Sequence, residues 1–211
     1  MLRMTKALCG VRADQGASYQ KLEALASHVR EQLSFAPDAA IDPLRLFEDL
    51  HDISIRSGGQ LIPLRSGVVA LEDSEGYARY DRDRKLIEIL ASERIYEWLE
   101  RGHPRASYFV AHELGHCVLH TDQLIRLAQM PTNQQAALHR DRVGHKPFQD
   151  TEWQANAFAS ALLMPARGIA SLEQKYGHVN AELIVDQFGV SREAAGYRLS
   201  LFNERKGDLL R

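Results

Sequence analysis

Two histidines one helical turn apart are the feature that most constrains what this chain can fold into. They belong to the run HELGHCVLH, residues 112–120, in a stretch from 104 to 120 that we predict to be a helix with Pro104 in its first turn. Positions four apart on a helix differ by about 40° around the axis and roughly 6 Å along it, so His112 and His116 project side by side. Two neutral imidazoles so placed can bind one metal ion. Zinc is favoured at this spacing, although manganese or iron could also be bound.

Glu113 follows the first histidine and projects about 100° away from it around the helix axis. It can therefore contact a water molecule on the metal without being a ligand, and we predict that it carries a proton from this water to the leaving amine of a cleaved peptide. The alternative is a chance match, but the apolar surroundings make three unpartnered polar side chains costly. The apolar neighbours are Val110, Ala111, Leu114, Cys117 and Val118.

The third protein ligand is less constrained by spacing. His120 lies one turn further along the same helix, and three ligands on one straight helix line up rather than surround an ion. Glu152 begins the segment EWQANAFASALLMP, in which Ala155 and Ala159 would let this helix approach the first one closely. Glu152 is the better candidate, although an acid in the first turn of a helix is also favoured by the helix dipole. The other downstream candidates are Asp122, His139, His145 and Asp150.

The blocks HELGHCVLH and EWQANAFASALLMP, in this order, resemble the ImmA/IrrE family of zinc metallopeptidases. The resemblance implies that His112, His116 and Glu152 bind zinc and that Glu113 is the catalytic base. It also implies that the substrate is a helix-turn-helix transcriptional repressor, whose cleavage derepresses stress-response or mobile-element genes. We therefore predict a zinc metallo-endopeptidase that acts on a regulatory protein partner.

The resemblance extends at lower specificity from about residue 46 to FGVSREAAGYRL near the C-terminus, and it leaves residues 1–40 uncovered. The run RASYFVAH, which begins at Arg105, stands where the family frequently has R-F-T-x-A-H. The segment between His120 and Glu152 is also long. Neither departure changes a proposed ligand.

The pattern of apolar residues predicts an α+β fold: a small antiparallel-rich sheet packed on helices, zincin-like, with an HExxH helix and a helical C-terminal part. We expect two or three short antiparallel strands between residues 58 and 90, and a long surface loop over residues 130–149. The predicted helices span residues 18–35, 43–50, 92–101, 104–120, 150–164, 179–188 and 191–203. The predicted organisation is an N-terminal helical extension (1–40), a metallopeptidase body (41–176) and a C-terminal helix pair packed on the body (177–211).

The segment LIVDQFGVSREAAGYRLSLF, residues 183–202, could be a DNA-binding helix-turn-helix. Only Arg192 and Arg198 supply clear basic contacts, so we favour a packed helix pair without direct DNA binding. The side chains predicted to lie inside this pair are Ile184, Val185, Phe188, Val190, Leu199 and Phe202.

The composition is that of an ordinary globular protein, with 45% hydrophobic and 26% charged residues in 211 and a net charge of -2. Such a charge gives no general attraction to nucleic acid or anionic membranes. Two cysteines are too few for a disulfide framework. Neither a signal peptide nor a membrane span is evident, so we expect a cytoplasmic protein without membrane association.

Several points stay open. A donor to the developing oxyanion could be Tyr77, Tyr80, His139 or His145, and an exposed strand edge could pair with an extended peptide. The oligomeric state and the cleavage site are not defined. The alternative function is a non-catalytic zinc protein that binds a regulator, or a component of a toxin–antitoxin pair; the presence of Glu113 favours the peptidase, because a binding module needs no base.

Overall fold

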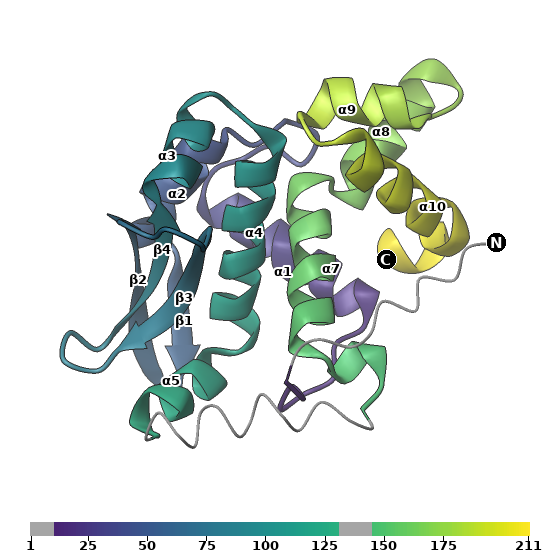
Figure 1. Cartoon of the computed structure of the whole chain (residues 1–211). Coiled ribbons are helices and arrows are strands. Elements are labelled where there is room, and N and C mark those ends of the chain that lie inside the picture. The colour runs from purple at the N-terminus through teal and green to yellow at the C-terminus, as the bar shows by residue number, and fades with distance from the viewer. Residues whose placement is uncertain (1–10, 131–144) are drawn as a thin grey trace.

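The structure is a computed structural model and describes residues 11–130 and 145–211. In these parts of the chain, one small sheet packs against helices, and two long helices lie side by side at the centre of the molecule (Figure 1). The predicted α+β class is confirmed.

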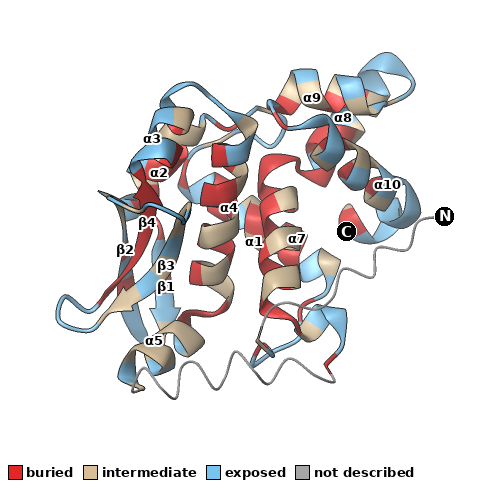
Figure 2. Ribbon diagram, viewed as in Figure 1, coloured by how far each residue is buried: buried red, intermediate tan, exposed pale blue. Residues whose placement is uncertain are grey.

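The sheet has the strand order β1-β2-β4-β3. The outer pairs β1–β2 and β3–β4 are antiparallel, and of these β3–β4 lies in the region where antiparallel strands were expected. Strands β2 and β4 are paired in parallel, because β3 lies outside β4 rather than between the two. This parallel pair was not predicted. The strand bounds are β1 Ser54–Ser57, β2 Gln60–Val69, β3 Gly76–Asp81 and β4 Leu86–Ser92. Strand β4 is buried along its whole length (Figure 2), so it anchors the sheet in the core, while β3 forms one edge.

Most helices lie where the sequence predicts them, and Ser18 caps the first one by accepting a hydrogen bond from the amide of Lys21. Helices α5 and α8 were not predicted, and α10 is longer than expected. The helix bounds are α1 Tyr19–Gln32, α2 Pro43–Glu48, α3 Glu93–Glu100, α4 Pro104–Leu119, α5 Thr121–Gln129, α7 Thr151–Leu163, α8 Ala166–Tyr176, α9 Ala181–Phe188 and α10 Arg192–Leu209. Short 3₁₀ turns, η1 Asp49–Asp52 and η2 Pro147–Gln149, complete the set. Of the predicted surface loop, residues 131–144 lie outside the described residues.

The C-terminal helices gather beyond the end of α7 (Figure 1) and are joined to the body by a buried ion pair. The guanidinium of Arg198 on α10 donates to Glu23 on α1 at 2.7 Å and to the carbonyl of Met164 at 2.7 Å. Arg198 is 1% exposed. It therefore ties α10 to α1 and to the end of α7, and it is not available to contact DNA. The division into the three predicted regions remains a prediction.

Within the described ranges, no helix combines the length and the apolar character needed to cross a bilayer.

Candidate metal centre

Helices α4 and α7 approach each other almost backbone to backbone. A Cβ atom built on Gly115 of α4 would lie 3.0 Å from the Cα of Ala155 and 3.2 Å from its carbonyl oxygen on α7. Ala155 and Ala159 are fully buried, and they are the small residues expected to permit this approach. The contribution of Gly115 was not predicted. Because the helices touch here, side chains flanking the contact are brought together with little freedom.

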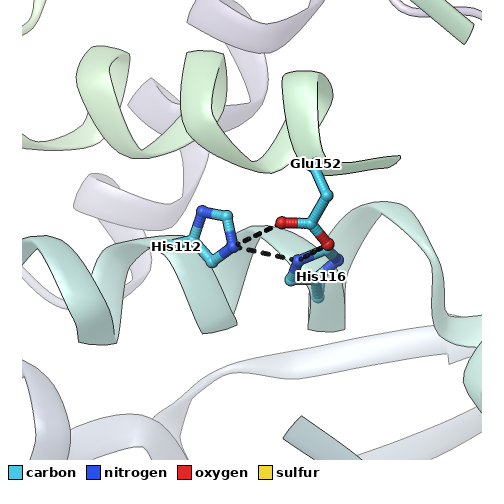
Figure 3. Close-up of side chains that lie close together, drawn as sticks. All are labelled: His112, His116 and Glu152. Carbon is cyan, nitrogen blue, oxygen red and sulfur yellow. Dashed lines mark hydrogen bonds and ion pairs between the residues drawn. The ribbon is translucent and has the colours of Figure 1, made fainter. Parts of the chain in front are cut away.

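Three of the predicted site residues converge beside this crossing (Figure 3). His112 and His116 project from α4, and Glu152 reaches them from the first turn of α7. The Nε2 atoms of the two histidines are 3.1 Å apart. One Glu152 oxygen lies 3.3 Å from Nε2 of His112, and the other lies 3.2 Å from Nε2 of His116. Their side chains are 16%, 16% and 34% exposed, so the cluster is recessed but reachable from solvent.

This geometry and donor set fit a zinc ion. Ligand atoms about 2.0–2.1 Å from a tetrahedral ion lie about 3.3 Å from one another. The two Nε2 atoms are 3.1 Å apart and each lies 3.2 or 3.3 Å from one of the two Glu152 oxygens, so the three side chains are spaced closely enough to share one ion. Two imidazoles and one carboxylate are also a donor set that catalytic zinc sites use, with a further position left for water. Hydrogen bonds with His112 and His116 lower the pKa of Glu152 well below its ordinary value. This carboxylate is therefore ionised and able to bind a cation.

Hydrogen bonds orient His112 for metal binding. Its Nδ1 lies 3.0 Å from Oδ1 of Asn156, and the same oxygen accepts a hydrogen bond of 2.7 Å from the hydroxyl of Tyr108. Burial raises the pKa of Tyr108 to about 12, which keeps its hydroxyl protonated as a donor. With Asn156 accepting at Nδ1, Nε2 of His112 faces Glu152 and is the ring nitrogen available to a metal ion. Sequence analysis did not identify Tyr108 and Asn156, although each lies four residues from a predicted ligand and so on the same helix face.

The other candidates for the third ligand lie elsewhere. His120 is placed behind His116, with its Nδ1 3.2 Å from Nδ1 of that residue. Asp122 accepts a hydrogen bond from Ser57. His145 pairs with Asp150 at 2.9 Å. His139 lies outside the described residues. Among the described residues, the group that could hold a metal is therefore His112, His116 and Glu152.

Glu113 lies between the histidine pair and the edge strand. One of its carboxylate oxygens accepts a hydrogen bond of 2.8 Å from the amide of Ala78 on β3. Burial raises the pKa of Glu113, and the nearby His116 and His112 oppose this rise. A raised pKa makes a carboxylate a stronger proton acceptor, which suits a general base. The amide of Ala78 also fixes the direction of this carboxylate.

The close crossing of α4 and α7 leads to a test with a matched control. Gly115→Ala is expected to lower the free energy of unfolding by about 1–3 kcal/mol, because the new methyl group presses on Ala155. Gly196→Ala, on α10, meets nothing within 4 Å and should raise this free energy by about 0.5–1 kcal/mol. Urea unfolding of both variants would measure the difference. Equal effects of the two substitutions would contradict a tight crossing.

The fold and the site define a metallopeptidase-like domain, in which an HExxH helix is joined by a carboxylate from a second helix. The chain belongs to the M78 peptidase family: the model of the IrrE N-terminal-like domain matches residues 73–200, a range that contains α4, α7 and every residue of the cluster. A solved structure similar to this chain is a Mycobacterium tuberculosis transcriptional regulator, with 20% identity and a TM-score of 0.46. The similarity covers 85% of this chain and 46% of that one, so the chain spans less than half of the regulator's length. No curated protein matches the chain.

Proposed function

We propose that this protein is a zinc-dependent endopeptidase that cleaves a regulatory protein partner, in particular a repressor of the helix-turn-helix type. The observation that carries the proposal is the convergence of His112, His116 and Glu152 next to Glu113, which is partly buried and whose carboxylate is held by the amide of Ala78. Membership of the M78 peptidase family supports the reaction class.

Each residue has a distinct role in the proposed reaction. His112, His116 and Glu152 would hold the metal, which supplies polarisation of the scissile carbonyl and acidification of the attacking water. Glu113 takes a proton from that water as its oxygen attacks the carbonyl carbon. Glu113 then returns the proton to the leaving amine nitrogen as the carbon–nitrogen bond breaks, which yields a free carboxyl group and a free amine.

The edge strand supports an extended substrate. Strand β3 pairs with β4 on one side, and its Ala78 amide is directed to Glu113 on the other. An extended peptide that pairs with this edge would bring its backbone beside the proton carrier. Substrates that dock through a large folded surface would be cleaved better than short peptides, because the docking energy positions the scissile bond.

The experiment compares cells that make wild-type protein with cells that make Glu113→Gln at the same level. New protein N-termini are identified by mass spectrometry of terminal peptides. A transcriptional regulator cut only in the wild-type cells would support the proposal, and the intact regulator should accumulate with the variant. Glu97→Gln, whose side chain is 61% exposed on α3, is the control and should behave as wild type.

Identical sets of N-termini in wild-type and Glu113→Gln cells would overturn the proposed peptidase. If the purified protein nevertheless contained zinc and bound a regulator, it would be a non-catalytic binding protein.

A further inference from the structure

A chain of hydrogen bonds leads outward from His116 through two residues that the proposed reaction does not use. Nδ1 of His116 lies 3.2 Å from Nδ1 of His120, and Nε2 of His120 lies 3.0 Å from Oε1 of Gln154. The amide nitrogen of Gln154 donates to the backbone carbonyls of Gln15 and Phe148, both at 2.8 Å. His120 is 5% and Gln154 is 2% exposed. These two side chains are therefore sheltered from competing water.

The two backbone carbonyls determine the orientation of the Gln154 amide. Carbonyl oxygens only accept hydrogen bonds, so the NH₂ group of Gln154 must face Gln15 and Phe148. Its oxygen then faces His120, and because this oxygen can only accept, Nε2 of His120 must carry a proton. A neutral imidazole has a single N–H, which leaves a lone pair on Nδ1 of His120.

That lone pair decides the tautomer of His116. Two ring nitrogens 3.2 Å apart need one donor and one acceptor, so Nδ1 of His116 carries a proton. Nε2 of His116 is then the ring nitrogen left to bind zinc. The opposite arrangement would need a second proton on His120 and hence a buried cation, whose ring nitrogens are hydrogen-bonded to an imidazole and an amide oxygen. Nε2 of His116 lies 3.1 Å from Nε2 of His112 and 3.2 Å from an oxygen of Glu152, so it faces the position that a shared zinc ion would take.

The outer end of this chain is held by the N-terminal segment, residues 11–17, which lies beside the start of α7 (Figure 1). The amide of Thr151 donates to the carbonyl of Val11 at 3.0 Å, and the amide of Ala13 donates to that of Gln149 at 2.8 Å. This segment precedes the residues matched by the family model, which begin at residue 73. The carbonyl of Gln15, which accepts a hydrogen bond from Gln154, therefore belongs to a part of the chain outside the family match.

We propose that His120 and Gln154 are positioning residues of the metal centre, which hold His116 in the tautomer whose Nε2 can bind zinc. This inference rests on the proposed zinc site but not on peptidase activity. Outer hydrogen-bond partners of metal-binding histidines typically change metal affinity by about 10–100-fold when they are removed.

The first measurement is zinc affinity of the full-length protein by competition with a chromophoric chelator. His120→Phe and Gln154→Leu are each expected to weaken zinc binding by about 10–100-fold. His120→Asn keeps an acceptor near the position of Nδ1 and should restore most of the affinity. Gln123→Leu is the matched control: the side chain of Gln123 donates to the carbonyl of Arg12 in the same N-terminal segment, and its loss should leave zinc affinity unchanged.

The second measurement reads the tautomer directly. Two-bond proton–nitrogen couplings in NMR spectra of ¹⁵N-labelled protein show which ring nitrogen of His116 carries the proton. We expect a proton on Nδ1 in the wild type and in Gln123→Leu, and a mixture of both tautomers in metal-free Gln154→Leu. A loss of packing alone would not redistribute the proton in this way.

Unchanged affinity and an unchanged His116 tautomer in both His120→Phe and Gln154→Leu would overturn the inference. If the wild type bound no zinc, the proposed function would fail, but the spectra of the metal-free protein would still decide this point. Loss of the proton from Nδ1 of His116 in part of the Gln154→Leu molecules would support the positioning role, and an Nδ1 without a proton in the wild type would contradict it.

Discussion

Glu113→Gln is expected to lower kcat for cleavage of the protein substrate by about 100-fold or more, while zinc stays bound. Glutamine has the size of glutamate, and its side-chain oxygen can still accept the hydrogen bond from the amide of Ala78. It cannot take a proton from the attacking water. Because substrate contacts are retained, KM should change little and the loss should fall on kcat.

The measurement uses the purified variant and the substrate identified from its new N-terminus, with zinc content determined by elemental analysis of the same sample. Glu97→Gln makes the same chemical change on the exposed face of α3 and should cleave at the wild-type rate. Cleavage by Glu113→Gln within a few-fold of wild type would assign the proton transfer to another group.

Glu152→Ala should remove zinc from the purified protein, whereas the wild type and Glu113→Gln should each contain about one zinc per chain. Zinc that binds only the folded state, at a concentration about 1,000 times its Kd, stabilises the wild type by about 4 kcal/mol. For a chain of this size each kcal/mol moves Tm by about 2–4 °C, so zinc should raise the wild-type Tm by roughly 8–16 °C. Glu152→Ala should show no such rise.

The control for this prediction is Glu93→Ala, which removes an exposed acid from the first turn of α3. It should lose only the favourable interaction with the helix dipole, about 0.3–1 kcal/mol, and keep the full zinc-dependent rise in Tm. Calorimetry with and without zinc compares the three proteins. Full zinc retention in Glu152→Ala would make its carboxylate dispensable and return His120, His139 and His145 to consideration as ligands.

The residues at the centre of the site could be predicted because the information is local. The four-residue spacing of His112 and His116 places them on one helix face whatever the rest of the chain does. Ala155 and Ala159 indicated that the Glu152 helix could come close, and the cluster lies where these helices meet. The assignment of these residues as zinc ligands remains a prediction that the metal analysis tests.

Features that depend on contacts distant in sequence could not be predicted. His120 ends α4 with φ -122° and ψ 23°, so its ring leaves the helical direction, and its partner Gln154 is 34 residues away. The parallel pairing of β2 with β4 depends on β3 taking the edge position, which alternation of apolar residues does not specify. Asn156 shares a helix face with Glu152, but its contacts with Tyr108 and His112 form only where the two helices meet.

The contact between Gly115 and Ala155 has a consequence for how such a protein could be controlled. The proposed ligands come from two helices that meet through fully packed backbone, so a change that separated them would also open the hydrophobic core. A conformational change that inactivated the protein by separating α4 from α7 would therefore cost a large part of the folding free energy. Regulation of access to the site has a lower free-energy cost, because it depends only on whether a partner presents a suitable segment of its chain. If the proposed function is correct, the metal-binding cluster is permanently assembled, and the timing of cleavage is set by when a substrate protein becomes available.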